Sequence, residues 1–269
     1  MFAKIRHIAI SSDNYPLLGL FYQALFGLKT SANARPEAAV VVSDGYVGMN
    51  INPRPLGCVA RLDHFGFEVP DPDIVAARVR EAYPAIGFIK RPATRPFAGY
   101  TMHDPSGIYF DLGYPRMEHT QDVYADAALR GQPHRRRIHH FQLRVLDAPR
   151  VAQFYRDIFE LEELPHDADD PSYYLTDGVV TMIVTPWRIE EFGGSNAQPL
   201  GLDHLGFVVE SIDQLDADLK RLMDRNYALI PRPGRGEENQ SRLELLAQCR
   251  HGRYQLTDPD GTLLDVTEG

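Results

Sequence analysis

The sequence predicts an α+β fold in which four βαβββ modules pair into two half-open barrel domains. A short strand motif containing a histidine occurs four times along the chain of 269 residues. Modules one and three align without a gap, so that His7 matches His140 and the Asp-Gly pair at 44–45 matches the pair at 177–178. Modules two and four share an Asp-Pro-x-Gly turn followed by a strand that carries an acid. Repeated supersecondary units of this kind indicate internal duplication.

Each half is expected to form one domain, with modules one and two in residues 1–113 and modules three and four in residues 137–269. Residues 114–136 are rich in Pro, Gly and charge and are interpreted as the linker, with a short helix around 123–130. The C-terminal half is longer than the N-terminal half, because it carries an insertion within residues 231–253.

Each module is expected to run strand, helix and then three strands. In module three the first strand is followed by Asp147, a typical helix N-cap, and in module two Asp71-Pro72 opens the helix. The Asp-Gly pair at 177–178 predicts a hairpin between two short strands. Apolar residues at helical spacing predict the buried faces of these two helices, which are Ala152, Tyr155, Ile158 and Phe159 in module three and Ile74, Val75 and Val79 in module two.

The first strand of each module has one apolar face, which is expected to pack against the helices. The histidine lies on the other face, beside small or polar residues. The acid on the last strand of modules two and four alternates with apolar residues in the same way. We therefore expect two histidines and one aspartate to face one cavity in each half: His7, His64 and Asp111, and His140, His204 and Asp265.

Two neutral imidazoles and one carboxylate on a rigid sheet are ligand types for an open divalent metal site. No thiolate is expected among the ligands, so such a site suits Fe(II), with Mn(II) as the alternative. A strand histidine can also be an ordinary core or surface residue, and that alternative stays open. The Asp-Pro-x-Gly turns are interpreted as structural, because Pro presets φ and Gly supplies a positive φ.

The strand histidine, the helix pattern Phe-Tyr-x-x-x-Phe-x-Leu and the Asp-Pro-x-Gly turn before an acid resemble the vicinal oxygen chelate superfamily. This superfamily includes glyoxalase I, fosfomycin and bleomycin resistance proteins and type I extradiol dioxygenases. Four modules in one chain are most similar to the extradiol dioxygenases. The resemblance implies an Fe(II) site formed by His140, His204 and Asp265, and oxygen insertion into a metal-chelated catechol.

The sequence departs from the dioxygenase pattern at the site. The acid is Asp instead of Glu, Gln255 stands where a catalytic Tyr is usual, and the pocket His is missing. His251 from the insertion could replace the pocket His, or it could lie on a surface loop. Arg144 and Gln255 are expected to line the site, where Arg144 would pair with an anionic substrate group or else with a neighbouring strand. Asn50 and Ile183 occupy the fourth-ligand position of glyoxalase-like isomerases, and neither is a good ligand.

Three functions remain open. The first is a ring-cleaving dioxygenase that acts in the C-terminal half on a catechol-type or other vicinal-oxygen molecule, with the charged run 235–239 as a lid. The second is a non-redox metal enzyme, such as a lyase, isomerase or hydrolase. The third is a metal-free binding or resistance protein whose ligand cup is lined by aromatic residues, namely Phe97, Tyr100, Tyr174 and Trp187.

The composition limits the kinds of molecule that the protein is expected to bind and the compartment in which it is expected to act. The formal net charge of −9 disfavours nucleic acid and anionic membranes, and the basic run 135–137 is too short to reverse this and is interpreted as a solvated linker end. Two distant cysteines fit unpaired thiols in a reducing compartment. There is no signal peptide pattern and no apolar run long enough to span a membrane, so we expect a cytoplasmic enzyme. The expected partner is a small, aromatic molecule, and homo-oligomerisation is a further option.

Overall fold

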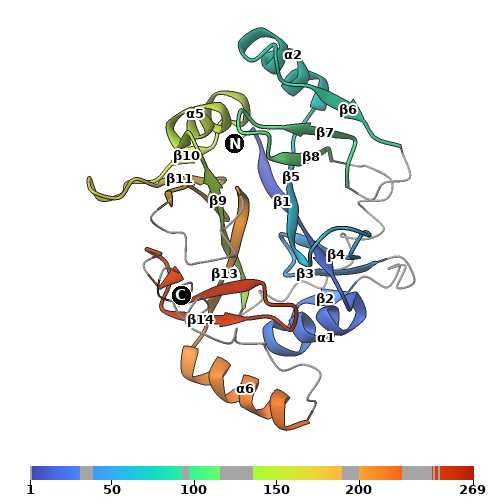
Figure 1. Cartoon of the computed structure of the whole chain (residues 1–269), viewed down its shortest axis with the longest axis vertical. Coiled ribbons are helices and arrows are strands. Elements are labelled where there is room, and N and C mark those ends of the chain that lie inside the picture. Colours follow the sequence, from blue (N-terminus) through green and yellow to red (C-terminus); the bar gives the residue numbers. More distant parts are fainter. Residues whose placement is uncertain are drawn as a thin grey trace.

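The computed structural model contains two mixed β-sheets and four helices among the residues it describes (Figure 1). Neither sheet closes into a barrel, and the predicted α+β fold is confirmed. Helices α2 and α6 lie at opposite ends of the long axis, with the strands between them (Figure 1). The helices are α1 (Tyr15–Phe26), α2 (Pro72–Ala82), α5 (Ala148–Phe159) and α6 (Ile212–Arg225). The described residues are 2–30, 39–92, 97–115, 136–189, 200–225, 244, 246–247 and 249–269.

The first sheet comes from modules one and two. Its strand order is β2-β3-β4-β1-β5-β8-β7-β6. Strands β1 and β5, which open the two modules, pair antiparallel at its centre, and each has a parallel neighbour from its own module, β4 and β8. The strands are β1 (Lys4–Ser12), β2 (Lys29–Thr30), β3 (Val40–Ser43), β4 (Gly48–Pro53), β5 (Arg61–Glu68), β6 (Phe88–Lys90), β7 (Tyr100–His103) and β8 (Tyr109–Gly113).

The second sheet, from modules three and four, repeats this plan. Its order is β10-β11-β12-β9-β13-β15-β14, with β9 and β13 antiparallel at the centre and with β12 and β15 as their parallel neighbours. Module four shows two strands after its helix in the described part of the chain. The strands are β9 (Arg137–Val145), β10 (Glu162–Glu163), β11 (Tyr173–Thr176), β12 (Thr181–Pro186), β13 (Gly201–Val209), β14 (Tyr254–Thr257) and β15 (Leu263–Glu268).

The predicted helix starts are confirmed. The carboxylates of Asp147 and Asp71 accept backbone N–H groups in the first turns of α5 and α2, as N-cap residues do. The four apolar positions of α5 are buried, and Val75 and Val79 of α2 are buried as well. Ile74, which was expected on the buried face of α2, is 44% exposed, so its assignment to the core was wrong.

The apolar faces of the two sheets meet in one core that both halves share. Phe67 of β5 stacks on Phe159 of α5, with ring centroids 4.3 Å apart. In the related position, Phe207 of β13 stacks on Phe26 of α1 at 3.9 Å. The second module of each half is therefore covered by a helix of the opposite half, which the strand pattern alone does not specify. Burial of these aromatic side chains is a large favourable contribution to folding.

Reciprocal hydrogen bonds also join the halves. The Asp44 carboxylate accepts the backbone N–H of Ile138 at 2.8 Å, and the Asp177 carboxylate accepts that of Ile5 at 2.6 Å. Both aspartates also accept backbone N–H groups in their own hairpin turns. Each hairpin thus fixes the beginning of the first strand of the other half, and these buried backbone donors are satisfied.

The Asp-Pro-x-Gly turns make a second reciprocal contact. Tyr22 of α1 donates its hydroxyl to Asp258 at 2.9 Å, and Tyr155 of α5 donates to Asp104 at 3.1 Å. The turns are structural, as predicted, but their aspartates also bind the helix of the opposite half. All four side chains are buried.

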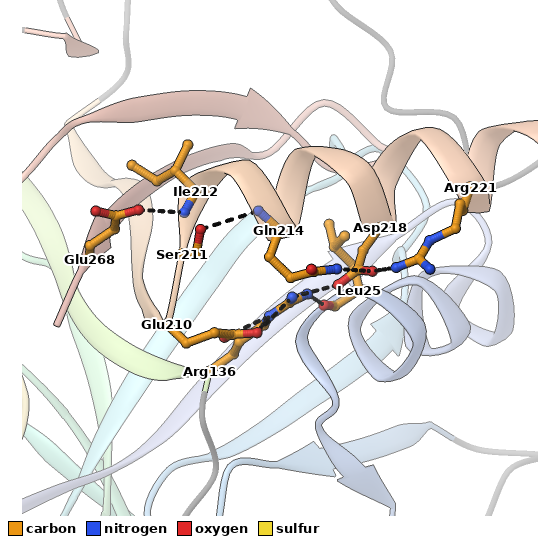
Figure 2. Close-up of polar contacts among 9 residues, drawn as sticks. All are labelled: Leu25, Arg136, Glu210, Ser211, Ile212, Gln214, Asp218, Arg221 and Glu268. Atoms are coloured by element: carbon orange, nitrogen blue, oxygen red, sulfur yellow. Dashed lines mark hydrogen bonds and ion pairs between the residues drawn. The ribbon is translucent and has the colours of Figure 1, made fainter.

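Arg136 precedes β9 and is buried, so the interpretation of the basic run 135–137 as solvated is wrong for this residue, whereas Arg137 is exposed. Its side chain is 9% exposed and bonds Glu210, Asp218 of α6 and the carbonyl of Leu25 (Figure 2). It therefore links the C-terminal end of α1 to β13 and α6. The predicted linker helix around 123–130 and the charged run 235–239 lie outside the described residues. None of the described helices is long and apolar enough to cross a membrane.

The buried Asp258 predicts a pH dependence of stability. Burial raises the pKa of Asp258 from the ordinary 3.8 to about 6. Its contribution to stability is therefore fully present below about pH 4 and is lost as the pH rises through about 6, at no more than about 1.4 kcal/mol per pH unit. Relative to Asp258→Asn, the wild-type chain should lose free energy of unfolding between about pH 4 and about pH 6. Denaturant titrations of metal-free protein check this.

The control is Asp213→Asn, since Asp213 is an exposed residue of the first turn of α6. Its pH profile should run parallel to that of the wild-type chain. Parallel profiles for wild type and Asp258→Asn would contradict the assignment of the raised pKa to Asp258.

Candidate metal centre

In each half the two predicted histidines and the aspartate lie together on three adjacent strands. In the C-terminal half, ligand atoms of His140 on β9, His204 on β13 and Asp265 on β15 all lie within 4.8 Å of one another. His7, His64 and Asp111 form the matching cluster on β1, β5 and β8. The strand alternation that predicted one shared face for each set thus agrees with the geometry.

A glycine lies on the middle strand of each cluster, and in the C-terminal cluster it makes room for a ligand side chain. Gly206 of β13 is in register with both His140 and Asp265. A Cβ atom at this position would lie 2.0 Å from the His140 ring, so only glycine leaves room for the imidazole to reach the acid. Gly66 stands between His7 and Asp111 in the same register.

A β-bulge directs the middle-strand histidine. The pairing of β13 with β9 shifts between Leu202 and Leu205, so that Asp203 and His204 together stand opposite one residue. The Nδ1 atom of His204 then lies 2.9 Å from Oδ2 of Asp203, which leaves Nε2 facing the cluster. Bulges commonly redirect side chains at functional sites, and a carboxylate behind a histidine is the usual support of a metal-binding imidazole. The bulge at Asp63 and His64 repeats the arrangement, with the two side chains 2.7 Å apart.

Arg144 supports this carboxylate. Its Nε lies 3.3 Å from Oδ1 of Asp203, and both side chains are almost fully buried. Of the two interpretations of Arg144, the structure shows the ion pair to a neighbouring strand. Burial alone would lower the pKa of His204, but Asp203 and the adjacent Cys249 raise it to about 10.

Gln255 holds the acid. It lies opposite Asp265 on β14 and donates Nε2–H to Oδ1 of Asp265 at 3.0 Å. Thr101 plays the same part for Asp111 in the first sheet. Burial would raise the pKa of Asp265, but His140, His204 and Gln255 together lower it, so the carboxylate is held ionised. Gln255 therefore faces the site as expected and positions the acid.

A thiol joins the C-terminal cluster, contrary to the expectation that none would. Cys249 offers Sγ within 4.8 Å of the ligand atoms of His140, His204 and Asp265. It belongs to the insertion, where no periodic pattern indicates which side chains point inward. Burial would raise the pKa of Cys249, but the neighbouring His140 and His204 lower it to about 7.

His251 also comes from the insertion and lies at the site instead of on a remote loop. Its ring centroid is 5.2 Å from that of His140 and 4.9 Å from that of His139. Burial, together with the charges of His140 and Arg250, lowers the pKa of His251 to about 4, so its imidazole is neutral at pH 7. Nε2 of His251 is buried and has no hydrogen-bond partner among the described residues.

The two clusters differ in how their polar atoms are satisfied. In the N-terminal cluster, Nε2 of His64 lies 3.3 Å from Nε2 of His7 and 3.2 Å from Oδ2 of Asp111, and Phe97 stacks on His7 at 4.7 Å. Phe97 has the same place before its hairpin as His251 has in the other half.

In the C-terminal cluster, Nε2 of His140 lies 3.3 Å from Oδ2 of Asp265, much as in the other half, but three buried atoms have no hydrogen-bond partner in the described part of the chain. They are Nε2 of His140, Nε2 of His204 and Oδ2 of Asp265. Leaving such atoms unsatisfied is unfavourable by about 1 to 3 kcal/mol each. A divalent cation would satisfy all three at once, so this donor set fits a metal.

Four residues at the C-terminal site were not predicted from the sequence: Asp203, Gly206, Cys249 and His139. Nδ1 of His139 lies 3.0 Å from Nδ1 of His140. The repeated Asp-His-x-Gly order in modules two and four was a usable signal for the first two. Asn50, at the expected fourth-ligand position, lies on β4, and its buried Oδ1 has no hydrogen-bond partner among the described residues. Ile183 is buried on β12.

Comparisons with solved structures give the same fold over nearly the whole chain. A catechol 2,3-dioxygenase matches 100% of this chain and 88% of its own, with a TM-score of 0.63 and 13% identity. A 2,2',3-trihydroxybiphenyl 1,2-dioxygenase from Sphingomonas wittichii strain RW1 matches 100% and 91%, with a TM-score of 0.62 and 16% identity. The Mn(II)-bound glyoxalase from Novosphingobium aromaticivorans matches 99% and 82%, with a TM-score of 0.64 and 16% identity.

No protein of curated function matches the chain in sequence. A family model does match residues 137–266, which contain β9 to β15 and the whole C-terminal cluster. The matching model is that of the Glyoxalase/Bleomycin resistance protein/Dioxygenase superfamily, which is the vicinal oxygen chelate superfamily that the sequence resembles.

Proposed function

We propose that the chain is a divalent-metal-dependent enzyme that binds a small molecule through two adjacent oxygen atoms. His140, His204 and Asp265 would hold the metal. The observation that carries this proposal is the set of three buried atoms of these residues that have no hydrogen-bond partner in the described chain and face one point.

The C-terminal cluster is the better candidate for the working site. In the other half, Nε2 of His7 and Nε2 of His64 pair with each other at 3.3 Å, whereas Nε2 of His140 and Nε2 of His204 have no hydrogen-bond partner among the described residues. Phe97 also stacks on His7, where the C-terminal half has the polar His251. We therefore keep the N-terminal set as the second candidate.

A bound metal would act as a Lewis acid that polarises the chelated oxygens. Asp203 orients the imidazole of His204. Gln255 orients the carboxylate of Asp265. His251 is neutral and close to His140, so it can accept a proton from an oxygen of the substrate. Of the three residues proposed for catalysis from sequence, His251 is the one that remains a proton-transfer candidate, while Arg144 and Gln255 position other groups.

The first candidate reaction is extradiol cleavage of a catechol-type ring, with Fe(II) as the metal and Mn(II) as the alternative. The four-module architecture supports it, and two of the structural relatives are named as dioxygenases of catechol or trihydroxybiphenyl. His251 would supply the base that the missing pocket His provides in the enzymes that the sequence resembles.

The second candidate is non-redox chemistry on a vicinal-oxygen substrate, as a lyase, isomerase or hydrolase. The presence of Cys249 favours it, because a fourth donor beside the triad leaves fewer open positions. A metal-free binding protein is the least favoured function, since it would leave the three buried atoms unsatisfied. The net charge of −9 supports a small-molecule partner instead of nucleic acid. We also propose a cytoplasmic location, and homo-oligomerisation as a further option.

Replacing one histidine in each half distinguishes the two sites. His140→Ala should lose the bound metal and all metal-dependent activity, because it removes one of three ligands, whereas His7→Ala should keep both. Elemental analysis of protein purified without air measures metal per chain, and circular dichroism verifies that both variants fold. Loss of metal in His7→Ala alone would contradict the assignment.

The glycine between the two ligands provides an independent test. Gly206→Ala should lower metal affinity and destabilise the fold by about 1 to 3 kcal/mol, because its Cβ would overlap the His140 ring. Gly87→Ala is the matched control, since a Cβ there meets nothing within 4 Å. Isothermal titration with metal and denaturant unfolding measure the two effects. Equal metal affinity and equal stability of the two variants would argue against the approach of His140 to Asp265 over Gly206.

The reaction class can be tested with oxygen. If the first candidate is correct, the Fe(II)-loaded chain consumes O2 when substituted catechols are added, and His251→Ala lowers turnover by about a hundredfold or more. An oxygen electrode records the uptake. Full metal loading with no uptake across a catechol series would reject ring cleavage and leave the non-redox class.

A further inference from the structure

The C-terminal cluster contains a fourth donor that its counterpart in the N-terminal half lacks. We infer that Cys249 is a protein ligand of the metal, which makes the centre a four-ligand site of two imidazoles, one carboxylate and one thiolate. This inference rests on the proposed metal site and narrows its chemistry. The donor sulfur lies within 4.8 Å of ligand atoms of all three other residues.

Two consecutive turns hold Cys249 against the sheet. Its backbone N–H donates to the carbonyl of Leu246 at 2.9 Å, and its own carbonyl accepts the N–H of Gly252 at 3.0 Å. Gly252 lies directly against the acid, since a Cβ there would be 2.4 Å from Oδ1 of Asp265. The backbone after Cys249 can approach the carboxylate this closely because the residue is glycine.

The partner atoms point to a ligand independently of the cysteine. Nε2 of His140, Nε2 of His204 and Oδ2 of Asp265 belong to side chains that are at most 1% exposed, and none has a hydrogen-bond partner among the described residues. A cation among these atoms and the thiolate would satisfy every one of them. The N-terminal cluster contains no cysteine among the described residues.

A thiolate ligand changes the preferred metal. When Cys249 binds, its S–H bond breaks, the sulfur forms the bond to the metal and the proton leaves to solvent. Thiolate and carboxylate together neutralise the charge of a divalent ion. Soft sulfur donors favour Zn(II), Co(II) or Fe(II), whereas Mn(II) prefers oxygen donors.

Four protein ligands also restrict the reaction. In six-coordinate geometry they leave two positions, and the two vicinal oxygens of a chelated substrate fill both. If Cys249 binds, no position would remain for O2 beside a chelated substrate, and the non-redox class, which is the second candidate above, would then rank ahead of ring cleavage.

Co(II) loading of the metal-free chain tests the ligand directly. A thiolate ligand gives an intense sulfur-to-cobalt charge-transfer band in the near ultraviolet, which imidazole and carboxylate ligands do not give. We expect one Co(II) in the C-terminal site with this band, and Cys249→Ser should lose the band and weaken Co(II) binding at least about tenfold. Cys58→Ser is the matched control, because Cys58 is exposed and should leave the spectrum unchanged.

Alkylation of the wild-type chain gives a second readout that needs no variant. Iodoacetamide should modify Cys58 with and without metal, but Cys249 in the metal-free chain only, as mapped by peptide mass spectrometry. Tight Co(II) binding without the band and without protection of Cys249 would overturn the inference while the three-ligand site stands. Failure of the wild-type chain to bind Co(II) would overturn both.

Discussion

The alternation of apolar and polar faces along the central strands is the constraint on which the rest of the structure depends. The apolar face of β5 packs on Phe159 of α5, and that of β13 packs on Phe26 of α1. Because α5 and α1 each also contact a strand of the opposite half, the halves stabilise each other through one core. The opposite face of each sheet is then free of core packing, and it carries the two clusters of histidine and aspartate.

Much of this arrangement could be predicted from the sequence, because it follows from periodicity. The period of two placed His140, His204 and Asp265 on one face, and they do lie together. Contacts between segments far apart in the chain could not be predicted in this way. Strand pattern does not show that Tyr22 binds Asp258, or that the buried Arg136 links α1 to α6.

The local departures from regular structure could not be predicted from the strand and helix periodicity either. A bulge turns Asp203 behind His204, and it gives Arg144 a buried carboxylate as its partner. The insertion has no periodicity, so the positions of Cys249 and His251 depend on tertiary packing alone. These exceptions concentrate at the candidate metal centre, where local rules are commonly broken for function. The two halves thus share a scaffold, and they differ in the residues that cover it.

The central claim is that the C-terminal cluster holds a divalent metal. A crystal structure of the metal-loaded chain, with anomalous difference maps recorded at the absorption edge of that metal, tests the claim most directly. Our account predicts one dominant peak among His140, His204 and Asp265, with Cys249 in its coordination sphere. A dominant peak among His7, His64 and Asp111, or no peak in either half of fully loaded protein, would contradict it.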